Sequence, residues 1–174
     1  GSCWIWAVAQ ATGKLEWDSA ALPPSDADLR LEADWRRRVA QRMCLNAEQL
    51  EIPANAQYIR NMAAETLRSV KYTGSKYTPG AWGGFDQLTV LAEEIETNIV
   101  SWHLLESEGT HATIYRANGQ VVGNADIAGL DAWAADQQHD TIHIIYNGDN
   151  HYETFERALH DQARWNFAPD ARHT

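Results

Sequence analysis

The chain has 174 residues, carries a formal net charge of −10 at pH 7 and has a pI near 5.0. Its length suits one compact domain with a sizeable core, and 44% hydrophobic and 22% charged residues are ordinary for a globular protein. The acidic balance disfavours binding to nucleic acid or to anionic membranes and favours a basic partner. The sequence contains no basic cluster other than the three arginines at 36–38.

The cysteine content points to a reducing, intracellular environment. Cys3 and Cys44 are too few for a disulfide framework, and two thiols alone cannot complete a zinc site. No apolar run is long enough to span a bilayer, so we expect no membrane partner. The opening residues also lack the basic n-region of a signal peptide.

The first half of the chain is expected to be helical. Residues 3–12 are rich in alanine, and Gly13 is a plausible helix stop. Ser25 and Asp28 resemble a capping box, which predicts a helix from residue 26 to about residue 44.

The second expected helix carries an apolar stripe with a period of four residues. Its members are Leu31, Trp35, Val39 and Met43. Such a stripe is buried in a globular protein. Most of the arginines of this helix point elsewhere, and we interpret them as a solvated face rather than a binding patch; they are Arg36, Arg37, Arg38 and Arg42.

Pro53 breaks the chain before another amphipathic helix at 54–69, with Ile59, Ala63 and Leu67 in phase. Residues 71–84 are rich in Gly, Ser, Thr, Tyr and Pro and are predicted to form a loop. Loops of this length are often functional, and three aromatic side chains in it could line a substrate groove: Tyr72, Tyr77 and Trp82. A helix is expected at 85–96.

The second half of the chain reads as a sheet. Strands are expected at 98–105, 111–116, 121–124, 141–148 and 151–155. An Asn-Gly hairpin signal lies at 117–120. Short helices are expected at 127–136 and 154–165, followed by an irregular tail. A helical first half followed by strands predicts an α+β fold.

Cys3 stands at the start of the first expected helix. The helix dipole and the open N–H groups there stabilise a thiolate, which is the form that attacks a carbonyl. The N–H groups of Ser2 and Cys3 could face a developing oxyanion. The alternative is a small buried hydrophobe, which position alone favours for Cys3. Cys44, near a helix end with no acid–base partner in sequence, is expected to be a core or half-buried thiol.

A thiolate enzyme also needs a base, and the sequence holds seven histidines. His151 follows a strong strand and a turn, so rigid backbone could aim its ring at a distant partner. Its second ring nitrogen would need an acceptor. Glu153 lies on the same face of a strand as His151 and is the best local candidate, although Asp149 and Asn150 are also close. No metal-ligand pattern is apparent.

Three blocks of the chain, in this order, resemble those of the OTU (ovarian tumour) cysteine proteases, which are deubiquitinases. GSCWIWAVA is similar to the nucleophile block, and AWGGFDQLTVLAEEIETNIVSW to the central Trp-Gly-Gly block. TIHIIYNGDNHYETF is similar to the block that ends in His-Tyr. The resemblance spans residues 1–156. It implies one papain-like catalytic domain over residues 1–174, of α+β class, with a small, mostly antiparallel sheet packed between helices.

The resemblance also implies the roles of the site residues. Cys3 would be the nucleophile, His151 the general base and Glu153 the acid that orients it, with the backbone of Ser2 and Cys3 at the oxyanion. The substrate would be the isopeptide bond after the C-terminal glycine of ubiquitin or polyubiquitin, and the protein would be a monomer without metal or other cofactor. The candidates for the substrate groove are Trp82, Gly83 and Tyr152.

Two departures from the family pattern leave alternatives open. The aspartate often found three residues before the cysteine is absent, and residues 154–174 could replace the segment that usually precedes the nucleophile. Glu153 stands where Asp or Asn is common, so the acid could instead be Asp161 or Asp170. The functional alternatives are a ubiquitin-binding module without turnover and a papain-like thiol hydrolase with another substrate. The expected location is intracellular, or the host cytoplasm if the chain is an effector.

Overall fold

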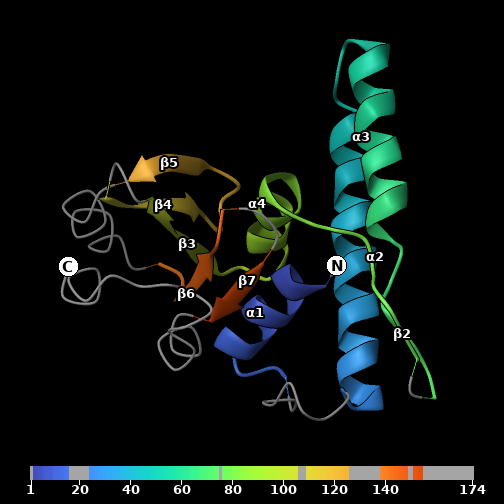
Figure 1. The fold of residues 1–174 in the computed structure, drawn as a ribbon. Helices are drawn as coiled ribbons and strands as arrows, with labels where there is room; N and C mark the ends of the chain where they lie inside the picture. Colours follow the sequence, from blue (N-terminus) through green and yellow to red (C-terminus); the bar gives the residue numbers. More distant parts are fainter. Residues whose placement is uncertain are drawn as a thin grey trace.

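The structure is a computed structural model that describes residues 2–15, 24–74, 76–105, 109–125, 138–148 and 151–154. Helices dominate its first half and strands its second (Figure 1). The helices are α1 (Cys3–Ala11), α2 (Asp26–Ala47), α3 (Pro53–Thr66) and α4 (Phe85–Glu94). The strands are β1 (Lys71–Thr73), β2 (Lys76–Thr78), β3 (Asn98–Leu105), β4 (Gly109–Tyr115), β5 (Val121–Ala125), β6 (Thr141–Tyr146) and β7 (Tyr152–Thr154).

The main sheet has the strand order β5-β4-β3-β6-β7. Every neighbouring pair is antiparallel except β3 and β6, which run parallel. This mostly antiparallel sheet with helices confirms the predicted α+β class. The order places β7 at one edge of the sheet, where α1 packs against it (Figure 1).

Helix α1 is buried from Trp4 to Ala9 because this stretch is apolar throughout. Trp4, Ile5 and Val8 have no exposed surface. The helix ends as predicted at Gly13, whose φ of +71° is a left-handed conformation that favours glycine. The Gly13 and Lys14 amides donate back into the last turn.

Helices α2 and α3 pack side by side as a long arm beside the sheet (Figure 1). The predicted capping box is confirmed: Asp28 N donates to Ser25 Oγ, and Ser25 N donates to Asp28 Oδ2. The apolar stripe is buried at Trp35, Val39 and Met43. Leu67 lies just beyond the last residue of α3 and is half-exposed. The predicted apolar stripe of this helix had included it with Ile59 and Ala63.

The segment predicted as a loop at 71–84 contains a hairpin. Strands β1 and β2 pair with Tyr72 opposite Tyr77, and their ring centroids are 5.2 Å apart. The repeated Lys-Tyr-Thr triplets supply β-forming residues on both sides of a turn, so cross-strand pairing overrides the turn-rich composition. Residues 79–84 remain without regular structure.

The remaining strands follow the prediction closely. The Asn-Gly turn joins β4 to β5, with Gly119 at φ +90°. The helices predicted at 127–136 and 154–165, and the tail after them, lie outside the described residues. No helix among the described residues is long and apolar enough to cross a membrane.

The main core lies between the helices and one face of the sheet. It joins residues of α1, α2, α3 and α4 to Ile99, Tyr115, Ile144 and Tyr152 of the sheet. A second, smaller apolar cluster on the sheet contains Val100, Ala112 and Ile114. Neighbouring residues of a strand, such as Ile99 and Val100 of β3, therefore point to opposite faces of the sheet and join different clusters.

Candidate active site

Cys3 is the first residue of α1, and Ser2 is its N-cap. The Ser2 carbonyl accepts hydrogen bonds from the amides of Ile5 and Trp6, both at 3.0 Å. The Ser2 side chain makes no capping bond to its own helix. The N-terminus of a helix carries a partial positive charge, which favours an anion or a thiolate there.

Hydrogen bonds to Asn147, which follows β6, position His151. The His151 amide donates to Asn147 Oδ1 at 3.1 Å, and the Asn147 amide donates to the His151 carbonyl at the same distance. Gly148 has a φ of +84°, a conformation that L side chains rarely adopt. These bonds hold His151 directly before β7, the strand that packs on α1.

The thiol of Cys3 meets both His151 and the start of β7. Burial raises the pKa of Cys3, but hydrogen bonds from the His151 ring and the Tyr152 backbone amide, with the attraction of His151, outweigh it. The pKa of the thiol therefore lies below its ordinary value. Lowering of this kind is what activates a cysteine as a nucleophile.

Glu153 completes a row of three side chains. Its Oε1 lies 3.4 Å from His151 Nε2, and only 9% of its side chain is exposed. With Nε2 beside the carboxylate, Nδ1 is the ring nitrogen left to face the thiol. The structure thus brings together Cys3, His151 and Glu153, as the sequence reasoning expected. The other acid candidates, Asp161 and Asp170, lie outside the described residues, as do Asp149 and Asn150.

A buried charged cluster lies directly behind Ser2, and sequence reasoning missed it. Arg36 and Glu32 have no exposed surface, and they form an ion pair through Arg36 Nε. The expectation that Arg36 belongs to a solvated face is therefore wrong. Its partners also include the carbonyls of Thr66 and Ala81, which come from distant segments. The one local signal was the spacing of Glu32 and Arg36, four residues apart on a helix.

Segment 79–84 runs against helix α1 and depends on two glycines. A Cβ at Gly80 would lie 2.5 Å from Arg36 Nη2, and a Cβ at Gly83 would lie 2.4 Å from Trp4 Cε2. The indole of Trp4 therefore packs directly on the Gly83 backbone. The neighbouring Trp82 turns outward and is 58% exposed.

The groove candidates thus occupy different positions. Trp82 offers an exposed ring, whereas Gly83 offers backbone beside α1. The Tyr152 ring is buried and stacks on Tyr146 with centroids 4.5 Å apart. What Tyr152 brings to the thiol is its backbone amide. On β2, the half-exposed Tyr77 lies near the site: burial and the charges of Cys3 and Glu32 raise its pKa, against Arg36, which lowers it.

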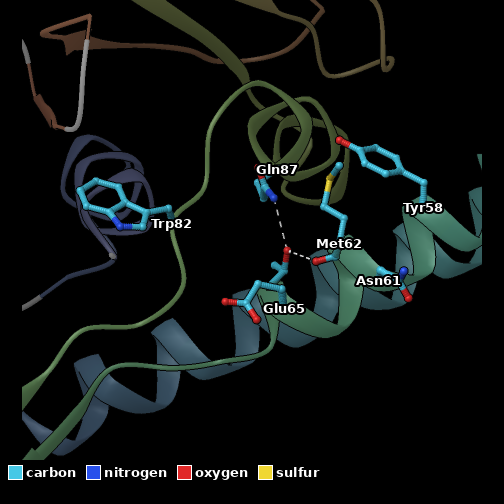
Figure 2. Close-up of a pocket in the computed structure, with 7 residues that line it drawn as sticks. Tyr58, Asn61, Met62, Glu65, Trp82 and Gln87 are labelled. Carbon is cyan, nitrogen blue, oxygen red and sulfur yellow. Dashed lines mark hydrogen bonds between the residues drawn. The ribbon is translucent and has the colours of Figure 1, made fainter.

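A surface pocket of about 440 Å³ borders the same segment. Figure 2 shows Tyr58 and Met62 of α3 and Gln87 of α4 on one side, with Trp82 standing apart on segment 79–84. Gln87 Nε2 donates to Thr66 Oγ1 at 3.4 Å, and Gln87 Oε1 accepts from the Gly84 amide at 2.8 Å. These bonds tie the pocket wall to the segment beside Cys3.

Within the described part of the chain, no three His, Cys, Asp or Glu side chains gather in a way that could hold a metal ion. Both cysteines are free thiols. The expectation of a core or half-buried Cys44 is wrong, because its side chain lies on the exposed face of α2.

No protein-family model matches the sequence. No curated protein matches it either. Among solved structures, the chain is similar to the OTU domain of OTUD1, with a TM-score of 0.50 and 14% identity over 88% of this chain and 77% of that one. It is also similar to the Hazara virus OTU bound to ubiquitin, with a TM-score of 0.47 and 12% identity over 88% of this chain and 73% of that one.

The likeness to OTUD1 covers most of the chain and identifies the fold. The protein has the fold of OTU domains, which confirms the resemblance drawn from the three sequence blocks at the level of fold.

Proposed function

We propose that the protein is a deubiquitinase that hydrolyses the isopeptide bond after the C-terminal glycine of ubiquitin. The observation that carries this proposal is the alignment of Cys3, His151 and Glu153 at the N-terminus of a buried helix. The OTU-like fold supports the choice of substrate. The acidic net charge suits a basic, extended tail.

The mechanism would begin with the Cys3 thiolate beside a protonated His151. The sulfur attacks the glycine carbonyl, and the resulting oxyanion meets the amides of Ser2 and Cys3. His151 then passes its proton to the departing lysine amine, which leaves an acyl-enzyme on Cys3. A water molecule gives a proton to His151 and attacks the thioester, so ubiquitin departs with a free carboxylate and the thiol is restored.

Glu153 would act through His151 rather than on the substrate. A carboxylate beside Nε2 holds the ring in one orientation and stabilises its charged form during the reaction. Its low exposure keeps this interaction away from water, where it would be weaker. The site needs a reduced thiol, so we place the protein in a reducing, intracellular compartment, the host cytoplasm if it is an effector.

The test is a ubiquitin probe with a C-terminal electrophile, followed by cleavage of di-ubiquitin. We expect covalent labelling of the wild-type protein at Cys3 and none of Cys3→Ala. His151→Ala should label far more slowly, and Cys44→Ser should label like the wild type. Labelling that persists in Cys3→Ala would show that the nucleophile is assigned wrongly.

The alternatives give different results in the same experiment. Reversible association with ubiquitin, without labelling of a reactive Cys3, would indicate a binding module. No response to any ubiquitin-like probe, together with rapid alkylation of Cys3 by a small reagent, would indicate a thiol hydrolase with another substrate.

A further inference from the structure

Ser2 is an N-cap residue whose hydroxyl does not cap its own helix. A serine at this position usually accepts a bond from the second or third amide of the helix. Here the hydroxyl turns to α2, where it donates to Glu32 Oε1 at 3.1 Å and accepts from Arg36 Nη2 at 3.0 Å. The Ser2 hydroxyl thus binds to α2 and not to the amides of its own helix.

Arg36 connects this hydroxyl to two other parts of the chain. Nη1 donates to the Thr66 carbonyl at the end of α3, at 3.0 Å. Nη2 also donates to the Ala81 carbonyl at 2.9 Å. A single guanidinium on α2 therefore connects three other parts of the chain. They are the end of α3, segment 79–84 and the turn formed by Ser2 and Cys3.

The cluster is poorly explained as a device for stability alone. A buried ion pair is often no more stabilising than apolar side chains of the same volume. Glu32 Oε2 is buried and has no hydrogen-bond partner among the described residues, which adds an energetic cost. What the cluster does provide is a fixed geometry at Ser2, which is 2% exposed.

We propose that Ser2, Glu32 and Arg36 are positioning residues that hold the Ser2–Cys3 turn against His151 and segment 79–84. This inference rests on the proposed function, because that turn would supply both the nucleophile and the amides that receive the oxyanion. In the described part of the chain, the titratable groups around the Cys3 thiol include His151 before β7, with Glu153 beside it, and Tyr77 on β2. Glu32 and Arg36 lie on α2 behind Ser2, and the amino terminus also lowers the pKa of the thiol.

The test uses Ser2→Ala in a Cys44→Ser background, where Cys3 is the one remaining thiol. Ser2→Ala removes the hydroxyl and leaves the pair of Glu32 and Arg36 intact. The matched control is Ser101→Ala. Ser101 is also fully buried, but it lies on β3, and its hydroxyl has no hydrogen-bond partner among the described residues.

Two readouts separate positioning from simple loss of stability. The first is the pH midpoint of Cys3 alkylation by iodoacetamide, which we expect to rise by about half a unit in Ser2→Ala as the turn loosens. The second is di-ubiquitin cleavage, where we expect kcat to fall about tenfold with KM unchanged, because the oxyanion amides are displaced. Ser101→Ala should change neither.

The thermal midpoint of each variant shows whether it is folded at the assay temperature. Arg36→Lys serves as a second variant: it keeps a charge beside Glu32, but its ammonium cannot reach all four acceptors that the guanidinium holds. We expect it to change both readouts in the same direction as Ser2→Ala. A folded Ser2→Ala whose alkylation pH midpoint and kcat both match the wild type would overturn the proposal. Unfolding of both Ser2→Ala and Arg36→Lys would overturn it as well.

Failure of this inference differs from failure of the proposed function. A wild-type protein that ignores the ubiquitin probe, while Ser2→Ala still shifts the alkylation midpoint, removes the deubiquitinase assignment and retains the positioning role. A wild-type protein that reacts with the probe, while Ser2→Ala matches it in both readouts, removes the positioning role alone.

Discussion

At the scale of single residues, the reactivity of Cys3 depends on a balance between burial and hydrogen bonding. Burial disfavours the thiolate, and the contacts with His151 and the Tyr152 amide favour it. Since burial is the largest single influence, loss of either contact should raise the pKa of the thiol. The lowered pKa therefore depends on the packing of α1 against β7.

His151→Ala should raise the pKa of Cys3, because burial remains while the bond and the attraction of the imidazole are lost. We expect the midpoint of the alkylation rate against pH, measured in a Cys44→Ser background, to move up by about one unit or more. His139→Ala removes an exposed histidine and is the control. An unmoved midpoint in His151→Ala would mean that the ring does not contact the thiolate in solution.

Glu153→Gln should lower kcat for di-ubiquitin by about tenfold or more, because an uncharged amide stabilises the imidazolium less than a carboxylate does. The substitution preserves the size of the side chain, so KM and the thermal midpoint should change little. Glu48→Gln, at an exposed position after α2, is the matched control. Full activity in Glu153→Gln would assign the orienting role to another acid, with Asp161 and Asp170 the next to substitute.

The three aligned residues could be found from the sequence, whereas the cluster behind them could not. Cys3 and His151 each stand at the junction of an element and a turn, and Glu153 follows from the period of a strand. Arg36 sits in a run of arginines whose local pattern indicates solvent. Its burial depends on carbonyls at Thr66 and Ala81, and their approach is set by tertiary packing alone.

At the scale of elements, segment 79–84 depends on the absence of side chains where it crosses α1. Gly83→Ala would place a methyl group within 2.4 Å of the buried Trp4 ring. We expect a loss of about 1–3 kcal/mol in the free energy of unfolding by urea, as for other overpacked sites. Gly123→Ala, on β5 with nothing within 4 Å of the added carbon, should cost much less. Equal stabilities would show that the segment moves freely.

Helices α2 and α4 are joined by an ion-pair cluster near the protein surface. Arg42 Nη1 lies 2.5 Å from Glu93 Oε1, and Arg42 Nε lies 2.5 Å from Glu94 Oε2. The Arg42 side chain is 37% exposed, so solvent weakens the attraction. Burial raises the pKa of Glu94, but its bonds to Arg42 and Arg38 outweigh burial and lower it.

Arg42→Gln should therefore destabilise the protein by less than about 1 kcal/mol at neutral pH. Because the pKa of Glu94 is lowered on folding, the contribution is present above the unfolded pKa and is lost as the pH falls through the folded one. The difference in urea midpoint between variant and wild type should shrink in acid and in high salt. Arg37→Gln, whose pair with Asp34 is more exposed, is the control.

Element boundaries could be predicted where local chemistry sets them. The capping box at Ser25 and the left-handed Gly13 both act within a few residues of themselves. The hairpin of β1 and β2 was missed because its composition indicates a loop, and only the pairing of Tyr72 with Tyr77 favours strands. Cross-strand contacts of this kind are weak in isolation and depend on their surroundings.

At the scale of the whole molecule, one main core connects the helices to the sheet that carries β7. Leu88 of α4 has no exposed surface within it. Leu88→Ala should lower the free energy of unfolding by about 2–5 kcal/mol. If helices and sheet unfold as one unit, the midpoints from tryptophan fluorescence and far-UV circular dichroism should fall together. Separate midpoints would show that the α2–α3 arm unfolds on its own.

The α+β class and the order of elements could be predicted because apolar periodicity changes from helical to alternating near residue 98. The parallel pairing of β3 with β6 could not, because it joins strands separated by more than thirty residues. That pairing is what places β7 at the edge beside α1. The position of Cys3 on α1 relative to His151 and Glu153 at β7 is therefore set by the complete fold.

The hydrogen bonds from Arg36 to the carbonyls of Thr66 and Ala81 also bear on how the sequence between these two residues could vary. The two carbonyls bracket residues 67–80, which include the hairpin and the half-exposed Tyr77. Because one side chain fixes both ends, the exposed hairpin between them can vary in sequence or length without displacing Ser2, whereas Gly80 cannot, since a Cβ there would lie 2.5 Å from Arg36 Nη2. The hairpin is thus an exchangeable segment at the rim of the proposed site, and its variation would change what the rim presents to a partner rather than the position of Cys3.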